Sequence, residues 1–114
     1  PFGYEEFAGQ NGLIGHAGLT VFDDSADMLG MARFAMEFCA IESCGKCTPC
    51  HLGSPELASS FSAVLAGEKM SASRWHDLID ALEATSLCGH GRGLAEFARA
   101  IERHYPEELA QCFA

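Results

Sequence analysis

Three cysteines packed into one short segment constrain this chain more than any other feature. Cys44, Cys47 and Cys50 stand at positions i, i+3 and i+6 of ESCGKCTPC, residues 42–50. A disulfide within CGKC or CTPC would close such a small loop that it would hardly restrict the unfolded chain. Gly45 and Pro49 both disfavour regular structure at this point. The spacing therefore predicts a loop that holds a metal or redox centre rather than a structural disulfide.

The pattern is three clustered cysteines plus one remote cysteine. Zinc sites usually show two separated pairs of ligands, whereas a triplet completed by a distant cysteine is typical of ferredoxin-type 4Fe-4S sites. The remote ligand is predicted to be Cys88 in SLCGHGRG, because the glycines there permit an unusual backbone path around a bulky cofactor. Two alternatives stay open. One is a zinc-stabilised helical interaction module, and the other is a thiol-disulfide protein that uses CGKC.

The remaining thiols and two histidines are weaker candidates. Cys39 lies beside Phe38 in a helical pattern and is predicted to be a small buried side chain. Cys112 is predicted to be a packing residue or a free thiol. His51 and His90 each lie within two positions of a predicted ligand, so either packing or a hydrogen bond to a cluster would explain them. Their roles stay open at the level of sequence.

Length, charge and the first residues limit the functional classes. A chain of 114 residues suits one modest core, and no apolar run approaches the roughly 20 residues of a membrane span. A net charge of -9 disfavours nucleic acid and anionic membranes as partners. The opening PFGYEEFAG has no features of a signal peptide and no initiator Met, so we expect a cytoplasmic protein cut from a longer chain.

Residues 1–24 differ in composition from the rest of the chain. Five glycines interrupt short apolar pieces there, and LTVF at 19–22 has the β-branched and aromatic composition of a strand. A single strand needs a partner, which must be short here or supplied by a longer protein. We expect residues 1–24 to be a linker or the end of a preceding β-rich domain.

Two amphipathic helices flank the cysteine triplet. The first is predicted from Ser25 over about 14 residues, with Asp24 or Ser25 as its cap. The second is predicted to begin at Ser54 and Pro55, a capping hydroxyl followed by a proline suited to the first helical position, and to stop at Gly67. Their apolar stripes are Met28, Met31, Ala35 and Phe38 in the first helix, and Leu57, Phe61, Val64 and Leu65 in the second.

Two further helices complete the pattern. One is predicted over about Ser73–Ala84 and the other over about Gly93–His104, with Pro106 ending it. Four amphipathic helices with short connections bury their stripes most simply as a bundle. We therefore predict a mostly α fold, a small four-helix bundle around an iron-sulfur cluster, over residues 25–114. The stripes of these last two helices are Trp75, Leu78, Ile79 and Leu82, then Leu94, Phe97, Ala98 and Ile101.

ESCGKCTPC followed by Gly53, together with SLCGHG, resembles the flavin-carrying, NADH-oxidising subunit of respiratory complex I and its relatives. These relatives include the diaphorase subunit of NAD-reducing hydrogenases and the beta subunit of NAD-dependent formate dehydrogenases. PFGYEEF and GLIGHAGLTVFDD look like the end of the preceding β-rich domain of that subunit. One position departs from the pattern, because the family usually has Arg where this chain has His51.

The resemblance implies that Cys44, Cys47, Cys50 and Cys88 bind one 4Fe-4S cluster. This cluster would take electrons from FMN elsewhere in the subunit and pass them to clusters in other subunits of an oxidoreductase complex. FMN and NAD are expected only in the part of the subunit outside this sequence, because GHGRG follows no strand and matches no dinucleotide-binding loop. We assign no catalytic acid, base or nucleophile, since electron transfer needs none.

Overall fold

The computed structural model describes residues 2–10, 12 and 19–114. Within these residues the chain forms helices and no sheet, with one isolated bridge between Met70 and Phe113. The predicted mostly α fold is therefore confirmed. The helices in chain order are α1 Tyr4–Gly9, α2 Met28–Glu42, α3 Thr48–Leu65, α4 Ala72–Thr85, α5 Gly89–His104 and α6 Pro106–Ala110.

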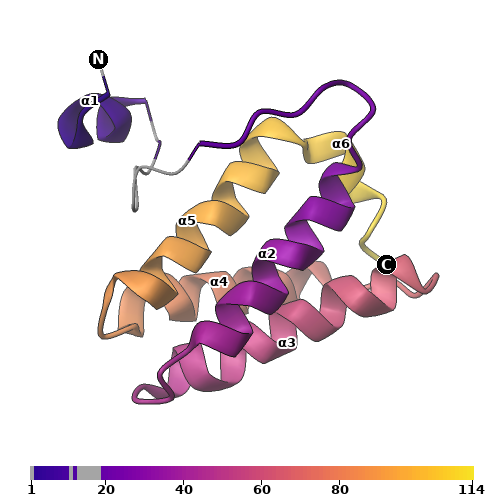
Figure 1. The fold of residues 1–114 in the computed structure, drawn as a ribbon. Helices are drawn as coiled ribbons and strands as arrows, with labels where there is room; N and C mark the ends of the chain where they lie inside the picture. The colour runs from indigo at the N-terminus through magenta and orange to yellow at the C-terminus, as the bar shows by residue number, and fades with distance from the viewer. Residues whose placement is uncertain (1, 11, 13–18) are drawn as a thin grey trace.

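Helices α2 to α5 form the predicted four-helix bundle (Figure 1). Helix α2 packs against α3 and α5, and α4 packs against the same two helices. The α2–α3 and α4–α5 connections lie at one end of the bundle, whereas the α3–α4 turn and the C-terminus lie at the other. There the N–H of Met70 donates to the carbonyl of Cys112 over 2.9 Å, which ties the chain end to the turn.

The core confirms the stripe predicted for α4 and part of those predicted for α3 and α5, in which Leu65 and Phe97 are exposed. Phe61 is fully buried, and its ring meets Trp75 edge to face with centroids 5.6 Å apart. The indole N–H of Trp75 donates to the Glu102 carboxylate over 2.6 Å, so its polar atom is satisfied. The other members of these stripes that are buried are Leu57, Leu78, Ile79, Leu82, Leu94, Ala98 and Ile101.

The stripe predicted for α2 was wrong. The helix buries Ala32 and Met36, whereas Met31 is 38% exposed and Phe38 is 55% exposed. Apolar residues occur on several faces of α2, so their periodicity cannot tell which face meets the core. The other apolar face borders an open groove of about 750 Å³ between α2 and α5, whose lining includes Phe22, Met28, Met31, Phe34 and Phe97.

The start of α2 also differs from the prediction. The N-cap is Asp27 rather than Asp24 or Ser25. Asp23 accepts hydrogen bonds from the Ser25 N–H over 2.9 Å and from the Ser25 hydroxyl over 2.5 Å, which forms a polar turn before the helix. Such local side-chain bonds compete with helix formation. The helix therefore begins at Met28, three residues after the predicted start at Ser25.

Two other helix starts lie before the predicted ones. Helix α3 begins at Thr48, so Pro55 lies inside it, and the Ser54 hydroxyl donates to the Cys50 carbonyl over 2.6 Å instead of capping a new helix. The proline at the helix start is Pro49. Helix α5 begins at Gly89 rather than Gly93. Pro106 does end α5, but it also opens the short helix α6.

The prediction for residues 1–24 can be compared with the structure only in part, because residues 1, 11 and 13–18 lie outside the described residues. Helix α1 occupies Tyr4–Gly9, where loop and strand were predicted. Residues 19–22 form no strand, since the described chain offers them no neighbouring strand to pair with. The strand prediction was therefore wrong for this segment.

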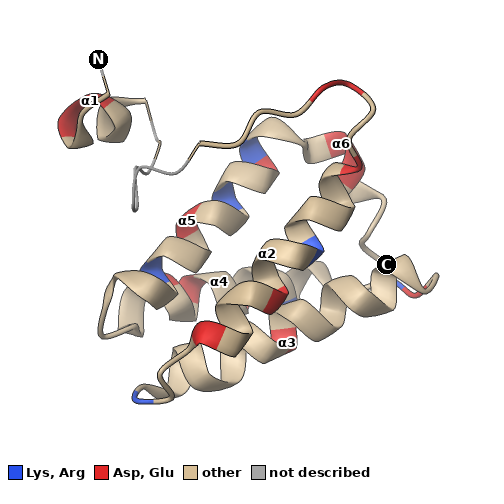
Figure 2. Cartoon of the chain, in the orientation of Figure 1, with Lys and Arg blue, Asp and Glu red and all other residues tan. Residues whose placement is uncertain are grey.

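Charged residues are spread over several helices and their connections, with acidic residues outnumbering basic ones (Figure 2). The ion pairs lie at the surface. Arg74 bonds Glu56 over 2.6 Å, and Arg99 bonds Asp80 over 2.7 Å. Among the described residues, no helix is both long and apolar enough to cross a membrane.

Candidate metal centre

The cysteine triplet spans a loop and the first turn of a helix. Helix α2 ends at Glu42, and Gly45 takes a left-handed conformation with φ of 76°, which glycine adopts without strain. Cys47 is then the N-cap residue of α3. The third cysteine, Cys50, lies in the first turn of that helix and is buried. The sequence pattern had placed the whole triplet in a loop, so the helical position of Cys50 is a finding of the structure.

The remote segment around Cys88 lies against the triplet. Backbone N–H groups lower the pKa of the Cys47 thiol by hydrogen bonding to its sulfur. The largest effect comes from Leu87, and the second comes from Cys50. A Cβ atom added to Gly91 would lie 3.3 Å from the Cβ of Cys50, so α5 approaches the triplet closely at that glycine. The fold thus brings together two segments that are well separated in the sequence.

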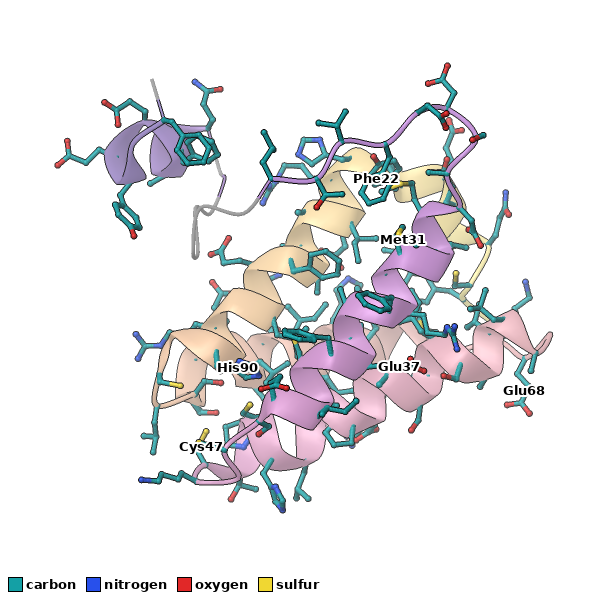
Figure 3. All side chains as sticks on the ribbon, in the orientation of Figure 1. Phe22, Met31, Glu37, Cys47, Glu68 and His90 are labelled. Atoms are coloured by element: carbon teal, nitrogen blue, oxygen red, sulfur yellow. The ribbon has the colours of Figure 1, made fainter. Side chains whose placement is uncertain are left out.

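Two helix starts meet at this end of the bundle. Cys47 is the N-cap residue of α3 and Cys88 is the N-cap residue of α5. The free N–H groups at a helix start carry partial positive charge, which favours thiolates and other anions nearby. Figure 3 shows Cys47 and His90 at the same end of the bundle, from the beginnings of these two helices.

The four predicted ligands differ in exposure. Cys50 is buried and Cys47 is half-buried, whereas Cys44 and Cys88 are exposed. All six cysteines of the chain are free thiols. Among the described residues, no three Cys, His, Asp or Glu side chains are gathered so as to hold a metal ion. The structure brings the triplet segment and the segment around Cys88 together, but the thiols themselves do not converge on a common centre.

The local chemistry fits an anionic sulfur-bound group. Four thiols are the ligand type that iron-sulfur clusters use, and two helix starts face the same region. In addition, the hydroxyl of Ser86 is buried and has no hydrogen-bond partner. Ser86 and Cys50 both pack on Gly91. An unsatisfied buried hydroxyl costs about 1–3 kcal/mol, and an acceptor held beside Cys50 would satisfy it.

Neighbouring residues of the site have identifiable roles. The His90 Nε2 lies 2.8 Å from the carbonyl of Cys39, so this ring bonds helix α2. The ring of His51 lies beside Gly45 in the triplet loop. Burial, with a smaller effect of Cys50, raises the pKa of the half-buried Cys39 thiol. Cys112 is fully buried and its thiol donates to the Glu108 carbonyl over 3.5 Å, as expected of a packing residue.

Sequence reasoning missed two residues of this region. Ser43 bonds Cys50, and Ser86 has the unsatisfied hydroxyl. The carbonyl of Ser86 accepts a hydrogen bond from Arg92 over 3.3 Å. Ser43 directly precedes Cys44, and Ser86 lies two positions before Cys88. Their nearness to the predicted ligands was the available signal, but a serine in a turn has many other uses.

Substitution of Gly91 by alanine is expected to destabilise the site. The added Cβ would lie 2.3 Å from the Ser86 hydroxyl oxygen and 2.8 Å from the Ser86 Cβ, so the start of α5 must shift. We expect the free energy of unfolding, measured by urea denaturation, to fall by about 1–3 kcal/mol. Gly89→Ala is the matched control, because a Cβ there meets nothing within 4 Å and alanine favours helix. Equal stability of both variants would contradict the close packing.

Residues 30–112 match the NADH-ubiquinone oxidoreductase-F iron-sulfur binding region. The chain belongs to this family. The cofactor of this iron-sulfur binding region is a 4Fe-4S cluster. The match includes the cysteine triplet, Cys88 and all four helices of the bundle apart from the first two residues of α2.

Relatives of this iron-sulfur binding region occur in larger proteins. The NADP-reducing hydrogenase subunit HndC of Solidesulfovibrio fructosivorans is 30% identical over 92% of this chain and 24% of its own length. An F-type chain of the NADH-quinone oxidoreductase of Rhizobium meliloti (strain 1021) is 31% identical over 93% of this chain and 26% of its own length. The chain thus spans about a quarter of the length of these curated relatives.

Solved structures agree with this assignment. The bundle superposes on a chain of an NAD+-reducing NiFe hydrogenase in its H2-reduced state with a TM-score of 0.73 and 29% identity. The match covers 82% of this chain and 17% of the hydrogenase chain. The same enzyme type in its air-oxidised state gives a TM-score of 0.74 and 28% identity. The arrangement of helices is therefore shared with part of a solved NAD+-reducing hydrogenase.

Proposed function

We propose that Cys44, Cys47, Cys50 and Cys88 bind one 4Fe-4S cluster that carries electrons within an NAD-linked oxidoreductase. The close approach of α5 to the triplet is the main support, because a Cβ added to Gly91, three residues after Cys88, would lie 3.3 Å from the Cβ of Cys50. Membership of an iron-sulfur binding family supports the same cofactor. When bound, the cluster supplies one-electron oxidation and reduction.

The chain's own residues hold and tune the ligands. The N–H of Leu87 donates to Cys47 and favours the thiolate that ligation requires. The starts of α3 and α5 direct partial positive charge toward Cys47 and Cys88. The buried position of Cys50 keeps water away from one side of the ligand set. These features position the sulfurs and set their electrostatic surroundings, and no proton transfer is required of them.

The electron donor and acceptor lie outside this chain. We infer that FMN and NAD bind in the remainder of a longer subunit, because the chain spans about a quarter of its relatives. Electrons would pass between that flavin and clusters in other subunits of a cytoplasmic complex. Two relatives are named as subunits of a hydrogenase and of an NADH-quinone oxidoreductase, so complexes of these two types should be tested first. A formate dehydrogenase is the third type of complex that we propose to test.

The segment before the bundle belongs to a different part of such a subunit. We propose that residues 1–24 are a linker or the end of a preceding domain, and that residues 25–114 are the cluster domain. None of the described residues before position 25 is buried, and α1 buries no residue. A segment that packs into the bundle core would bury apolar side chains, as α2 to α5 do.

Metal analysis tests this function directly. Anaerobically purified protein is expected to be brown, to contain about four irons and four sulfides per chain, and to give a paramagnetic signal when reduced. These properties come from the cluster itself and need no partner subunit. A colourless protein with one zinc per chain would instead establish the zinc-stabilised interaction module.

A further inference from the structure

Ser43 contacts the buried member of the cysteine triplet. Its hydroxyl oxygen lies 3.2 Å from the sulfur of Cys50, and it accepts a hydrogen bond from the N–H of Gly45 over 3.4 Å. Ser43 is the residue that follows α2, with an extended backbone, and it is half-buried. The hydroxyl is thus held between the triplet loop and the first turn of α3.

The direction of the hydrogen bond follows from the state of the sulfur. Between a free thiol and a hydroxyl, either group can donate. A cysteine that ligates a metal has lost its proton, so its sulfur can only accept. Because the Gly45 N–H already donates to the Ser43 oxygen, the hydroxyl proton is free to point at Cys50. Burial of Cys50 strengthens such a bond, since little water competes for the sulfur.

We propose that Ser43 raises the reduction potential of the site by donating a hydrogen bond to the Cys50 sulfur. This inference rests on the function proposed above. Reduction adds one electron from the flavin-side donor, no bond forms or breaks, and Ser43 keeps its proton. The added negative charge strengthens the hydrogen bond, so the bond stabilises the reduced state more than the oxidised state. Ser43 is therefore a positioning and tuning residue rather than a ligand.

A redox titration of anaerobically purified protein, followed by its paramagnetic signal, tests the role of Ser43. Ser43→Ala is expected to lower the reduction potential, with the ratio of reduced to oxidised protein at a fixed potential falling about tenfold, which is 59 mV for one electron. Ser43→Thr keeps the hydroxyl and is expected to retain the wild-type potential. Ser60→Ala is the matched control, because the Ser60 hydroxyl donates to the Glu56 carbonyl within α3.

The outcomes separate this inference from the proposed function. An unchanged potential in Ser43→Ala, with full iron content, would overturn the role of Ser43 and leave the cluster in place. A wild-type protein without iron would overturn the proposed function itself. If Ser43→Ala loses its iron, Ser43→Val is compared with Ser43→Thr, because valine has the shape of threonine without its hydroxyl, and the difference between their potentials decides the question.

Discussion

Replacing Cys88 by serine is expected to lower the iron content from about four atoms per chain to less than one. Cys88 is the predicted ligand that comes from outside the triplet, and it is the N-cap residue of α5. Without it, three thiols from one short segment must hold the cluster alone. Cys88 is exposed, so the substitution leaves the bundle core untouched. Iron and sulfide analysis, with circular dichroism to verify the helices, measures both effects.

Cys112→Ser is the matched control for this prediction. Cys112 is also a free cysteine, but it is fully buried beside the α3–α4 turn, where the N–H of Met70 donates to its carbonyl. A serine hydroxyl there can donate to the Glu108 carbonyl as the thiol does. We expect this variant to retain its iron. Equal iron contents in the Cys88 and Cys112 variants would show that the ligand set is wrong.

Truncating Phe61 to alanine is expected to lower the free energy of unfolding by about 3–5 kcal/mol. Phe61 is fully buried in α3 and packs edge to face on Trp75 of α4, so the substitution leaves a cavity between two helices. A domain has only about 5–15 kcal/mol of net stability, so the loss is a large part of the whole. Urea denaturation followed by the fluorescence of Trp75 measures it.

Leu65→Ala provides the comparison within the same helix. Leu65 is the last residue of α3 and is 45% exposed. Its truncation removes less buried surface, and we expect a loss of less than about 1 kcal/mol. If both variants were equally stable, Phe61 would not be the core residue that the structure indicates.

The sequence predicted helices best where polar and apolar residues were cleanly separated. In α4, charged residues alternate with the stripe of Trp75, Leu78, Ile79 and Leu82, and all four are buried. In α2, apolar residues cover more than one face, so the choice of Met31 and Phe38 as core residues failed. Periodicity identifies a helix, but the neighbours in the fold decide which face is buried.

At the candidate site, too, local sequence predicted some features and the packing of the fold decided the others. The spacing of the triplet and the glycines after Cys88 were enough to select four candidate ligands. The helical position of Cys50 was hidden by Ser54 and Pro55, which imitate a helix start seven residues late. The approach of Gly91 in α5 to Cys50 depends on how two connections meet in space. No single segment of sequence contains that information.

The two helix starts at the candidate metal centre link cofactor binding to the stability of the protein in the cell. Cys47 and Cys88 begin helices that are connected along the chain through α4 and its two connections. A cofactor bound by both would close that long loop and reduce the entropy of the unfolded chain. Its binding energy would then count as folding energy. Chains that never receive iron would open more often at this end, and cellular proteases would degrade them first.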